Sequence, residues 1–199
     1  GIGHAGDEYY MTAKRNECVV CGKKSGLSRH HVIPALYRKF FPDEIKKHSY
    51  HDILLLCCDC HESYEREADK VKLKLAEQYD YPVHGVGGEL DPVALKVVKT
   101  AIALYRHGHV IPEPRKGFLL AILKEYKGQE EITDEDIEEF ANLSVYNGEN
   151  WVSHGDYVVS QIDDPQEFVE MWREHFIESM QPKYLPEHWD LQRSIYKVC

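Results

Sequence analysis

Two Cys-x-x-Cys pairs constrain this chain more than any other feature of its sequence. Cys18 and Cys21 form the first pair, and Cys57 and Cys60 form the second. Four thiolates at such spacings form the closed tetrahedral ligand set of a structural zinc ion. A redox-active pair is the alternative, but the βαβ context of a thioredoxin-like fold is missing and the second pair stays unexplained. The sequence therefore predicts a zinc site that helps a small segment to fold.

The composition is that of a folded protein with reduced thiols. Of the 199 residues, 43% are hydrophobic and 11% are aromatic, which is typical of a globular chain. Four of the six cysteines lie in the two pairs, which favours metal over disulfides and a reducing compartment. No apolar run approaches the roughly 18 residues that span a bilayer, and no signal peptide is visible. We therefore expect an intracellular protein with no membrane partner.

The apolar pattern predicts an α+β fold in which a small zinc-stapled module precedes a mostly helical domain. The module is expected over 1–80, with strands at 27–33 and 52–56 and a helix over about 60–79. Residues 81–90 contain several glycines and a proline and are expected to form a linker. The helical domain is expected over 91–199, with a hairpin within 146–161.

A histidine doublet and a third histidine are the candidates for chemistry. His30 and His31 are adjacent, so on a strand their side chains point to opposite faces, and one can bind a metal while the other accepts a proton. His61 directly follows the second cysteine pair, and Asp52 lies where a carboxylate can orient a histidine. Of the remaining histidines, His48 and His51 are the candidates for a further ligand, because they lie close to Asp52 in sequence.

Basic charge is concentrated around the histidine doublet. The net charge of the chain is −10, yet residues 1–74 carry a balance of +2 and residues 75–199 a balance of −12. Residues 14–47 contain nine basic and three acidic side chains. This distribution favours a phosphate-bearing partner at the N-terminal module and a solvated or partner-binding face elsewhere.

Three features of this part of the sequence occur together: the two cysteine pairs, the histidine doublet followed by Val-Ile-Pro34, and the run Asp52-Ile-Leu-Leu-Leu-Cys57-x-x-Cys60-His61. In combination they resemble the HNH nuclease motif in its zinc-knuckle form. This resemblance implies a ββα-metal fold. It assigns His30 and His61 as ligands of a catalytic metal ion and His31 as the general base. Asp52 takes the middle position, which is usually Asn in that family. The aspartate keeps an acceptor and loses a donor, so it would orient His31 differently or join the metal shell.

The activity that this resemblance implies is metal-dependent hydrolysis of nucleic-acid phosphodiester bonds. One Mg²⁺ or Mn²⁺ ion would stabilise the negative charge that grows in the transition state, in addition to the structural Zn²⁺. His31 would take a proton from the attacking water. Five basic residues are candidates for clamping the DNA or RNA backbone: Arg29, Lys23, Lys24, Arg38 and Lys39.

The whole chain is also similar to the C-terminal region of the 3′–5′ exonuclease domain-containing protein 2 family. The similarity includes the stretch from His30 through Arg38-Lys39-Phe40-Phe41-Pro42, and the run from Trp172 to Pro186. In that family an exonuclease domain precedes this region. We expect the present chain to be a piece that lacks it, so exonuclease chemistry is not carried over.

A second function class stays open. In it, the chain is a non-catalytic zinc module that binds nucleic acid or a protein partner, and the acidic helical part is the working surface. The intact set of His30, His31 and His61 favours the nuclease hypothesis, because a binding module has no need of it. The oligomeric state is not encoded in any pattern of the sequence.

Overall fold

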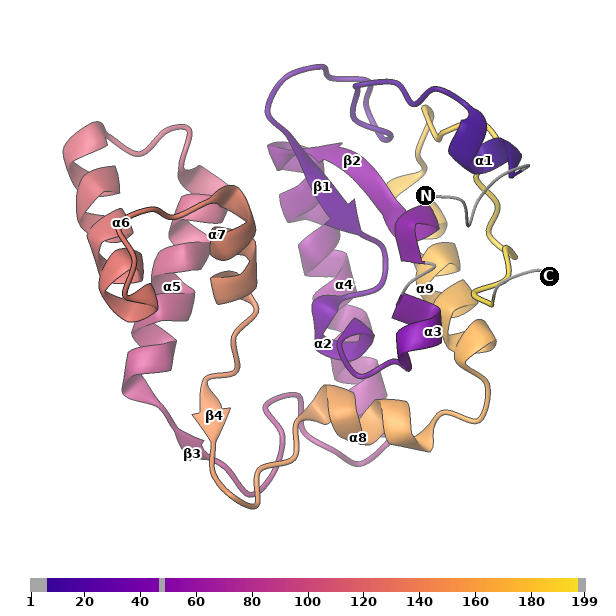
Figure 1. Cartoon of the computed structure of the whole chain (residues 1–199). Helices are drawn as coiled ribbons and strands as arrows, with labels where there is room; N and C mark the ends of the chain where they lie inside the picture. The colour runs from indigo at the N-terminus through magenta and orange to yellow at the C-terminus, as the bar shows by residue number, and fades with distance from the viewer. Residues whose placement is uncertain (1–6, 47–48, 197–199) are drawn as a thin grey trace. The chain divides into compact units, whose positions relative to one another are not determined.

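The computed structural model describes residues 7–46 and 49–196 and divides the chain into two compact units. Unit 1 comprises 1–83 and 155–199, and unit 2 comprises 84–154. Unit 2 is therefore inserted in the sequence between two parts of unit 1 (Figure 1).

Unit 1 is built around a short antiparallel ribbon. Its strands are β1 (Leu27–His31) and β2 (Ile53–Cys57), with Leu27 opposite Cys57 and His31 opposite Ile53. The small helical elements before β2 are α1 (Glu8–Met11), α2 (Ala35–Arg38), α3 (Asp43–Lys46) and the 3₁₀ turn η2 (Ser49–Asp52). The helices of unit 1 that follow are α4 (Cys58–Gln78), α8 (His154–Gln161, from the unit boundary) and α9 (Pro165–Met180).

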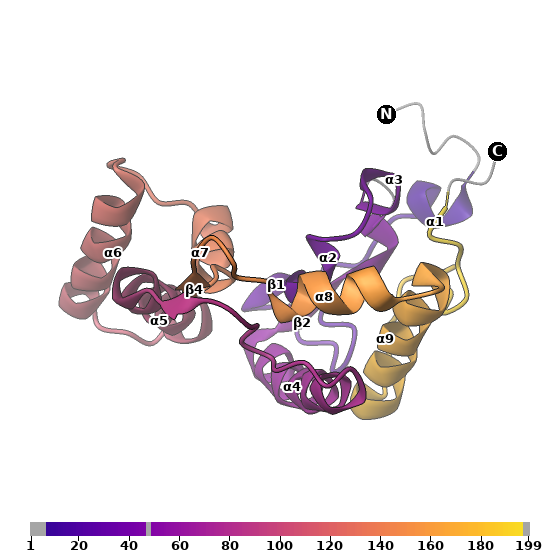
Figure 2. The same ribbon diagram turned by 90° about the horizontal axis from the view of Figure 1, so that it is seen from below.

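The core of unit 1 lies between the ribbon, α4 and α9. Helix α4 presents buried Tyr64, Ala68 and Leu75 along one face, at intervals close to one and two helical turns. Helix α9 contributes Trp172 and Phe176, which are fully buried. Figure 2 shows α9 beside α4, with the ribbon over α4. The C-terminal helix thus closes the module that the first 80 residues begin.

Helix α8 approaches the backbone of α2 closely. A Cβ atom at Gly155 would lie 1.8 Å from the carbonyl oxygen of Leu36, so glycine is required at this contact. Val158, one turn further on, is fully buried in the core of unit 1. Helix α8 therefore belongs to unit 1.

Unit 2 is a three-helix cluster that begins and ends in a paired stalk. The stalk strands β3 (Glu89–Leu90) and β4 (Tyr146–Asn147) are antiparallel, and Val86 bridges to Val152. The helices are α5 (Pro92–His107), α6 (Glu113–Lys127) and α7 (Asp134–Ala141). Each boundary follows local chemistry: the Asp91 carboxylate caps α5, Gly128 ends α6 with a positive φ, and Thr133 and Asp136 form a capping box for α7.

The observed architecture is mixed helix and small sheets, as the α+β expectation required. The division of the chain differs from the expected boundary at 81–90, because α8 and α9 pack into unit 1 and not with α5–α7. The hairpin expected within 146–161 is wrong. Residues 146–147 pair with β3 instead, and residues 154–161 form α8.

None of the helices in the described part of the chain combines the length and the apolar character needed to cross a membrane.

Candidate metal centre

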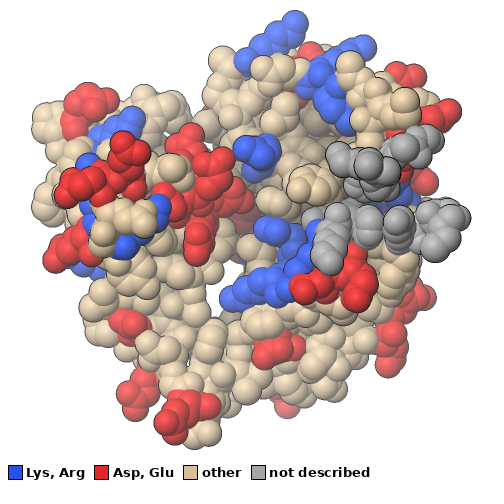
Figure 3. Space-filling view, in the orientation of Figure 1, with Lys and Arg blue, Asp and Glu red and all other residues tan. Residues whose placement is uncertain are grey.

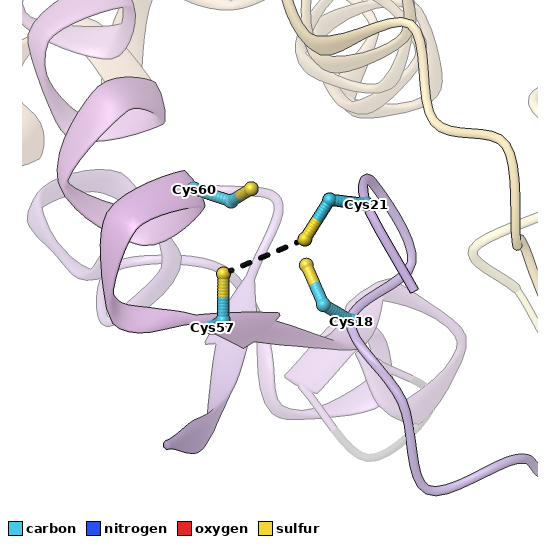
Figure 4. Close-up of side chains that lie close together, drawn as sticks. All are labelled: Cys18, Cys21, Cys57 and Cys60. Carbon is cyan, nitrogen blue, oxygen red and sulfur yellow. Dashed lines mark hydrogen bonds between the residues drawn. The ribbon is translucent and has the colours of Figure 1, made fainter. Parts of the chain in front are cut away.

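The four paired cysteines converge at one end of the ribbon (Figure 4). The sulfur atoms of Cys18, Cys21, Cys57 and Cys60 all lie within 4.8 Å of one another. Cys57 ends β2, Cys60 lies in the first turn of α4, and the loop that carries Cys18 hydrogen-bonds to β2 through the N–H of Val19 and the oxygen of Leu55. Backbone pairing thus brings the two cysteine pairs together across 35 residues of sequence.

The geometry of this cluster fits a tetrahedrally coordinated metal ion. The Sγ atoms of Cys21 and Cys57 are 3.7 Å apart. Zn–S bonds of about 2.3 Å place neighbouring sulfurs of a tetrahedron about 3.8 Å apart. Burial acts to raise the pKa of Cys18, but donation from nearby backbone N–H groups outweighs it and lowers that pKa to about 7. A thiol whose pKa is lowered to about neutral pH by backbone hydrogen bonds is suited to bind a metal ion as the thiolate.

A second cluster lies where the ribbon packs against α4. It consists of His30 from β1 with His61 and Glu65 from the first turns of α4, and their ligand atoms lie within 4.8 Å of one another. The Nδ1 atom of His30 is 2.9 Å from Nε2 of His61. The Glu65 carboxylate is 3.5 Å from that Nε2 and 4.0 Å from the His30 Nδ1. Two imidazoles and a carboxylate are a recurrent set in catalytic metal sites.

Ser28 orients one of these ligands. Its hydroxyl oxygen is 2.9 Å from Nδ1 of His61 and 3.4 Å from the carbonyl oxygen of Leu56. If the hydroxyl donates to the carbonyl, it accepts from Nδ1–H of His61. The lone pair of Nε2 then faces His30 and Glu65, which is the orientation that an outer partner gives to a metal-binding histidine.

The protonation states of this cluster suit metal binding. Burial, reinforced by the neighbouring His61, lowers the pKa of His30 to about 3. Burial acts to raise the pKa of Glu65, but His61 and the Lys72 ammonium outweigh it and lower that pKa to about 2. Near neutral pH the cluster therefore offers a neutral imidazole and a carboxylate anion, the forms that bind cations.

Glu65 was not among the ligands expected from the sequence. Its signal is its spacing: it lies four residues after His61 on a helix, so the two side chains share one face. Helix α4 carries ten acidic and basic side chains, so this pair does not stand out in the sequence from ordinary surface ion pairs. Its proximity to His30 of β1 distinguishes Glu65 from the other charged residues of α4.

His31 lies at the last position of β1, opposite Ile53. Because side chains alternate along a strand, it points away from the face that carries His30, as the doublet predicts. It is half-buried, whereas His30 is buried. Its role as a base stays a prediction.

Asp52 has a partner that the sequence did not suggest. Its two carboxylate oxygens accept hydrogen bonds from Arg173 of α9, at 2.6 and 3.0 Å. Its carbonyl oxygen accepts from the N–H of Val32, one residue after His31. The carboxylate thus anchors α9 to the end of the ribbon. Its expected roles of orienting His31 or joining the metal shell stay predictions.

His51 is engaged away from both clusters. Its ring stacks on Trp189 at a centroid distance of 5.4 Å, and its Nε2 is 2.7 Å from the carbonyl oxygen of Asp190. His51 is therefore a packing residue in this structure. His48 lies outside the described residues.

The five expected backbone clamps are dispersed over unit 1. Lys23 pairs with Asp59 at 3.2 Å, and Lys39 lies over the ring of Phe40. Lys23, Lys24, Arg29 and Lys39 are exposed, and Arg38 is half-buried. Figure 3 shows blue side chains along the face of unit 1 that carries β1 and α2.

Comparison with known proteins identifies homologues along nearly the whole chain. Exonuclease 3'-5' domain-containing protein 2 of Homo sapiens is 38% identical over 200 residues, which cover 96% of this chain and 32% of that protein. The Drosophila melanogaster protein of the same name is 35% identical, covering 97% of this chain and 35% of its own length. Protein RRP6-like 3 of Arabidopsis thaliana is 32% identical over 155 residues, which are 67% of this chain and 17% of that protein.

The chain thus spans about a third of the length of the first two relatives. No family model and no solved structure matches it.

Proposed function

We propose that this homologue of exonuclease 3'-5' domain-containing protein 2 is a nucleic-acid-processing module with an HNH-type endonuclease site. The observation that supports the proposal is the convergence of His30, His61 and Glu65 where β1 packs on α4, beside the four-cysteine cluster. A ribbon and a helix that hold a metal between them are the elements of a ββα-metal fold. Two of the relatives are named as exonucleases, which supports a role in nucleic-acid processing.

The cysteine cluster would hold a structural zinc, and the His30–His61–Glu65 cluster a catalytic divalent ion. When bound, that ion supplies charge neutralisation at the scissile phosphate. Imidazole ligands suit transition metals, whereas Mg²⁺ prefers carboxylates and water. Two histidines and one glutamate therefore favour Mn²⁺ over Mg²⁺. Three protein ligands also leave positions for phosphate and water.

His31 is the proposed general base. It lies at the end of β1, is half-buried, and is next in sequence to the buried His30. His30 and His31 point to opposite faces of β1, so a phosphodiester at the end of this strand would lie with the His30 cluster on one side and His31 on the other. The Asp52–Arg173 pair holds the backbone at this point, because Val32 donates to the Asp52 carbonyl. Asp52 is therefore proposed as a positioning residue.

The basic face of unit 1 would position the substrate. Arg29 shares the outer face of the ribbon with His31, since the two lie two residues apart on β1. Lys23 and Lys24 precede β1, and Arg38 and Lys39 follow it, so the chain adds positive charge before and after this strand. Contacts of this kind fix a nucleic-acid backbone without reading its sequence.

The rival function is a non-catalytic zinc module that binds nucleic acid or a protein. One observation favours a protein partner: residues 128–154 carry eight acidic side chains and no Lys or Arg. In Figure 3, red side chains gather over α7 of unit 2.

A cleavage assay separates the two functions. The zinc-loaded chain is incubated with single- and double-stranded DNA and RNA in Mn²⁺ or Mg²⁺. His31→Ala is compared with His107→Ala, an exposed histidine at the end of α5. Loss of a general base should lower the rate by about 10²–10⁴-fold, and the control should cut like the parent. A His31→Ala variant with parental activity removes His31 as the base. An inactive parent under every condition favours the binding module.

A further inference from the structure

A pocket of about 420 Å³ opens on the outer face of the ribbon, away from the His30 cluster. Ile53 and Leu55 of β2 contribute to its wall. They face the same side as His31 and Arg29, because cross-strand partners share a face and the pairs are His31–Ile53 and Arg29–Leu55. The wall of the pocket therefore includes Ile53, the cross-strand partner of the proposed base His31. None of the expected clamps lines it.

The pocket combines an aromatic ring with positive charge. Tyr184 lines it and is 40% exposed, and Lys14, Arg15 and Lys183 are the cationic side chains around it. Glu187 is the acidic member of the lining and lies 3.7 Å from the imidazole of His188. The balance of charge at the pocket is thus positive, although the chain as a whole is acidic.

The Tyr184 ring is held in place by the zinc-binding loop. Its backbone N–H donates to Val19, whose own N–H donates to Leu55 of β2. A Cβ atom on Gly22 would lie 3.0 Å from the tyrosine ring, so the ring rests against this glycine between Cys21 and Lys23. A ring fixed on a metal-stabilised turn is a rigid platform on which a planar group can stack.

The cations of the pocket differ in how far they are already engaged. The Lys14 ammonium donates to the backbone oxygens of Tyr9 and Thr12. Arg15 makes an exposed pair with Glu17 at 3.4 Å, which is a weak interaction that a phosphate can replace. Among residues 7–46 and 49–196, the exposed Lys183 ammonium has no hydrogen-bond or ion-pair partner. Lys183 is therefore the side chain best placed to meet an anion.

We propose that this pocket, the Tyr184 pocket, binds one unpaired nucleotide of a single-stranded DNA or RNA segment. The base would stack on Tyr184 against the apolar wall, and Lys183 and Arg15 would meet the phosphates. A volume of about 420 Å³ lies in the range of about 300–1,000 Å³ for small-ligand sites. A base can enter such a pocket when it is unstacked and unpaired. The inference rests on the proposed function, and it adds a preference for substrates with a single-stranded flank.

Binding measured without Mg²⁺ or Mn²⁺ tests the pocket apart from cleavage. The zinc-loaded full chain is titrated into fluorescein-labelled oligothymidylate, oligouridylate and a blunt DNA duplex, and anisotropy is followed at several salt concentrations. Lys183→Glu is compared with Lys99→Glu, which makes the same charge change at an exposed position of α5. Lys183→Glu should weaken binding of both single strands by about tenfold and reduce the salt slope by about one. Its effect on the duplex should equal that of the control.

Stacking is tested at Tyr184 itself. Tyr184→Phe keeps the ring and should bind single strands like the parent, whereas Tyr184→Leu should bind them about tenfold more weakly. Zinc content and circular dichroism verify that each variant is folded. If Tyr184→Leu loses zinc, the binding measured for Lys183→Glu is the test of the pocket. Parental single-strand affinity in Lys183→Glu, or an equal loss for the duplex, overturns the inference even where the chain cleaves nucleic acid. Conversely, a parent that binds through this pocket but cuts nothing overturns the proposed function alone.

Discussion

The carboxylate of Asp52 forms a bidentate ion pair with the guanidinium of Arg173, 121 residues further along the chain. Both side chains are buried. The same guanidinium donates to the carbonyl oxygens of Leu191 and Arg193. This one group therefore connects the end of the ribbon, α9 and the C-terminal segment.

Removal of Arg173 should destabilise unit 1 strongly. Arg173→Met leaves the Asp52 carboxylate buried without its partner, which costs about 3–5 kcal/mol. Chemical denaturation followed by tryptophan fluorescence reports the loss, since Trp172 is adjacent in sequence and fully buried. Arg66→Met, which removes an exposed pair with Glu62, is the control and should cost less than about 1 kcal/mol. A similar cost for both variants would contradict the role given to the buried pair.

Loss of zinc should unfold unit 1 and spare unit 2. Each chain is expected to hold one tightly bound zinc, and a chelator should remove the helical signal of α4, α8 and α9 while α5–α7 persist. Hydrogen exchange resolves the two units, because their cores share no residues. Protein that is folded and free of zinc would exclude the cysteine assignment.

The chain contains a matched control for that experiment. Cys57→Ser removes a ligand and should abolish zinc retention. Cys58→Ser changes the neighbouring thiol, which lies outside the cluster at 3.4 Å from the carbonyl oxygen of Gly26. Cys58→Ser should therefore keep one zinc per chain and the parental fold. Equal loss in both variants would indicate a general sensitivity of this turn.

Glu65→Gln should weaken the second metal site without unfolding the helix. The substitution keeps the shape of the side chain but removes the negative charge, so Mn²⁺ affinity should fall by about 10–100-fold. Calorimetric titration of zinc-loaded protein with Mn²⁺ measures the change. Glu62→Gln, one turn earlier on α4 and outside the cluster, should bind like the parent. Unchanged affinity in Glu65→Gln would remove this carboxylate from the ligand set.

Protonation of His51 in the unfolded chain should lower the free energy of unfolding in mild acid. Burial is the main cause that lowers its pKa below the ordinary value of 6.5, so the unfolded chain takes up this proton at a higher pH than the folded one. The contribution of His51 is therefore fully present above about pH 6.5 and is lost as the pH falls below it. Unfolding free energies measured from pH 7.5 to 5 should decline less steeply for His51→Gln than for the parent. Parallel curves would contradict the assignment.

The sequence predicted the local elements of the first 80 residues well, because their signals are local. Proline after the first strand, the apolar run before Cys57 and the helical stripe after Cys60 each gave an element within a few residues of its observed bounds. The two cysteine pairs predicted the ligand cluster for the same reason: the chemistry of thiols restricts what they can do together.

What the sequence did not predict depends on contacts between distant segments. The partner of Asp52 lies on α9, and the placement of α8 and α9 in unit 1 follows from burial against residues more than a hundred positions earlier. The residues 146–161 alternate like a hairpin, but Val158 is needed in the core and the segment 154–161 becomes a helix. Tertiary packing here overrides a weak local pattern.

The insertion of unit 2 in the sequence also delays the synthesis of the last helices of unit 1. All residues of both clusters lie before residue 66, whereas α9, whose Phe176 stacks on His30, begins at Pro165. At about 5–20 residues per second, a ribosome would expose the half-built module for several seconds before its last helix emerges. Zinc capture by the nascent chain would then precede closure of the fold, and cellular metal supply during translation would determine how much of the protein matures.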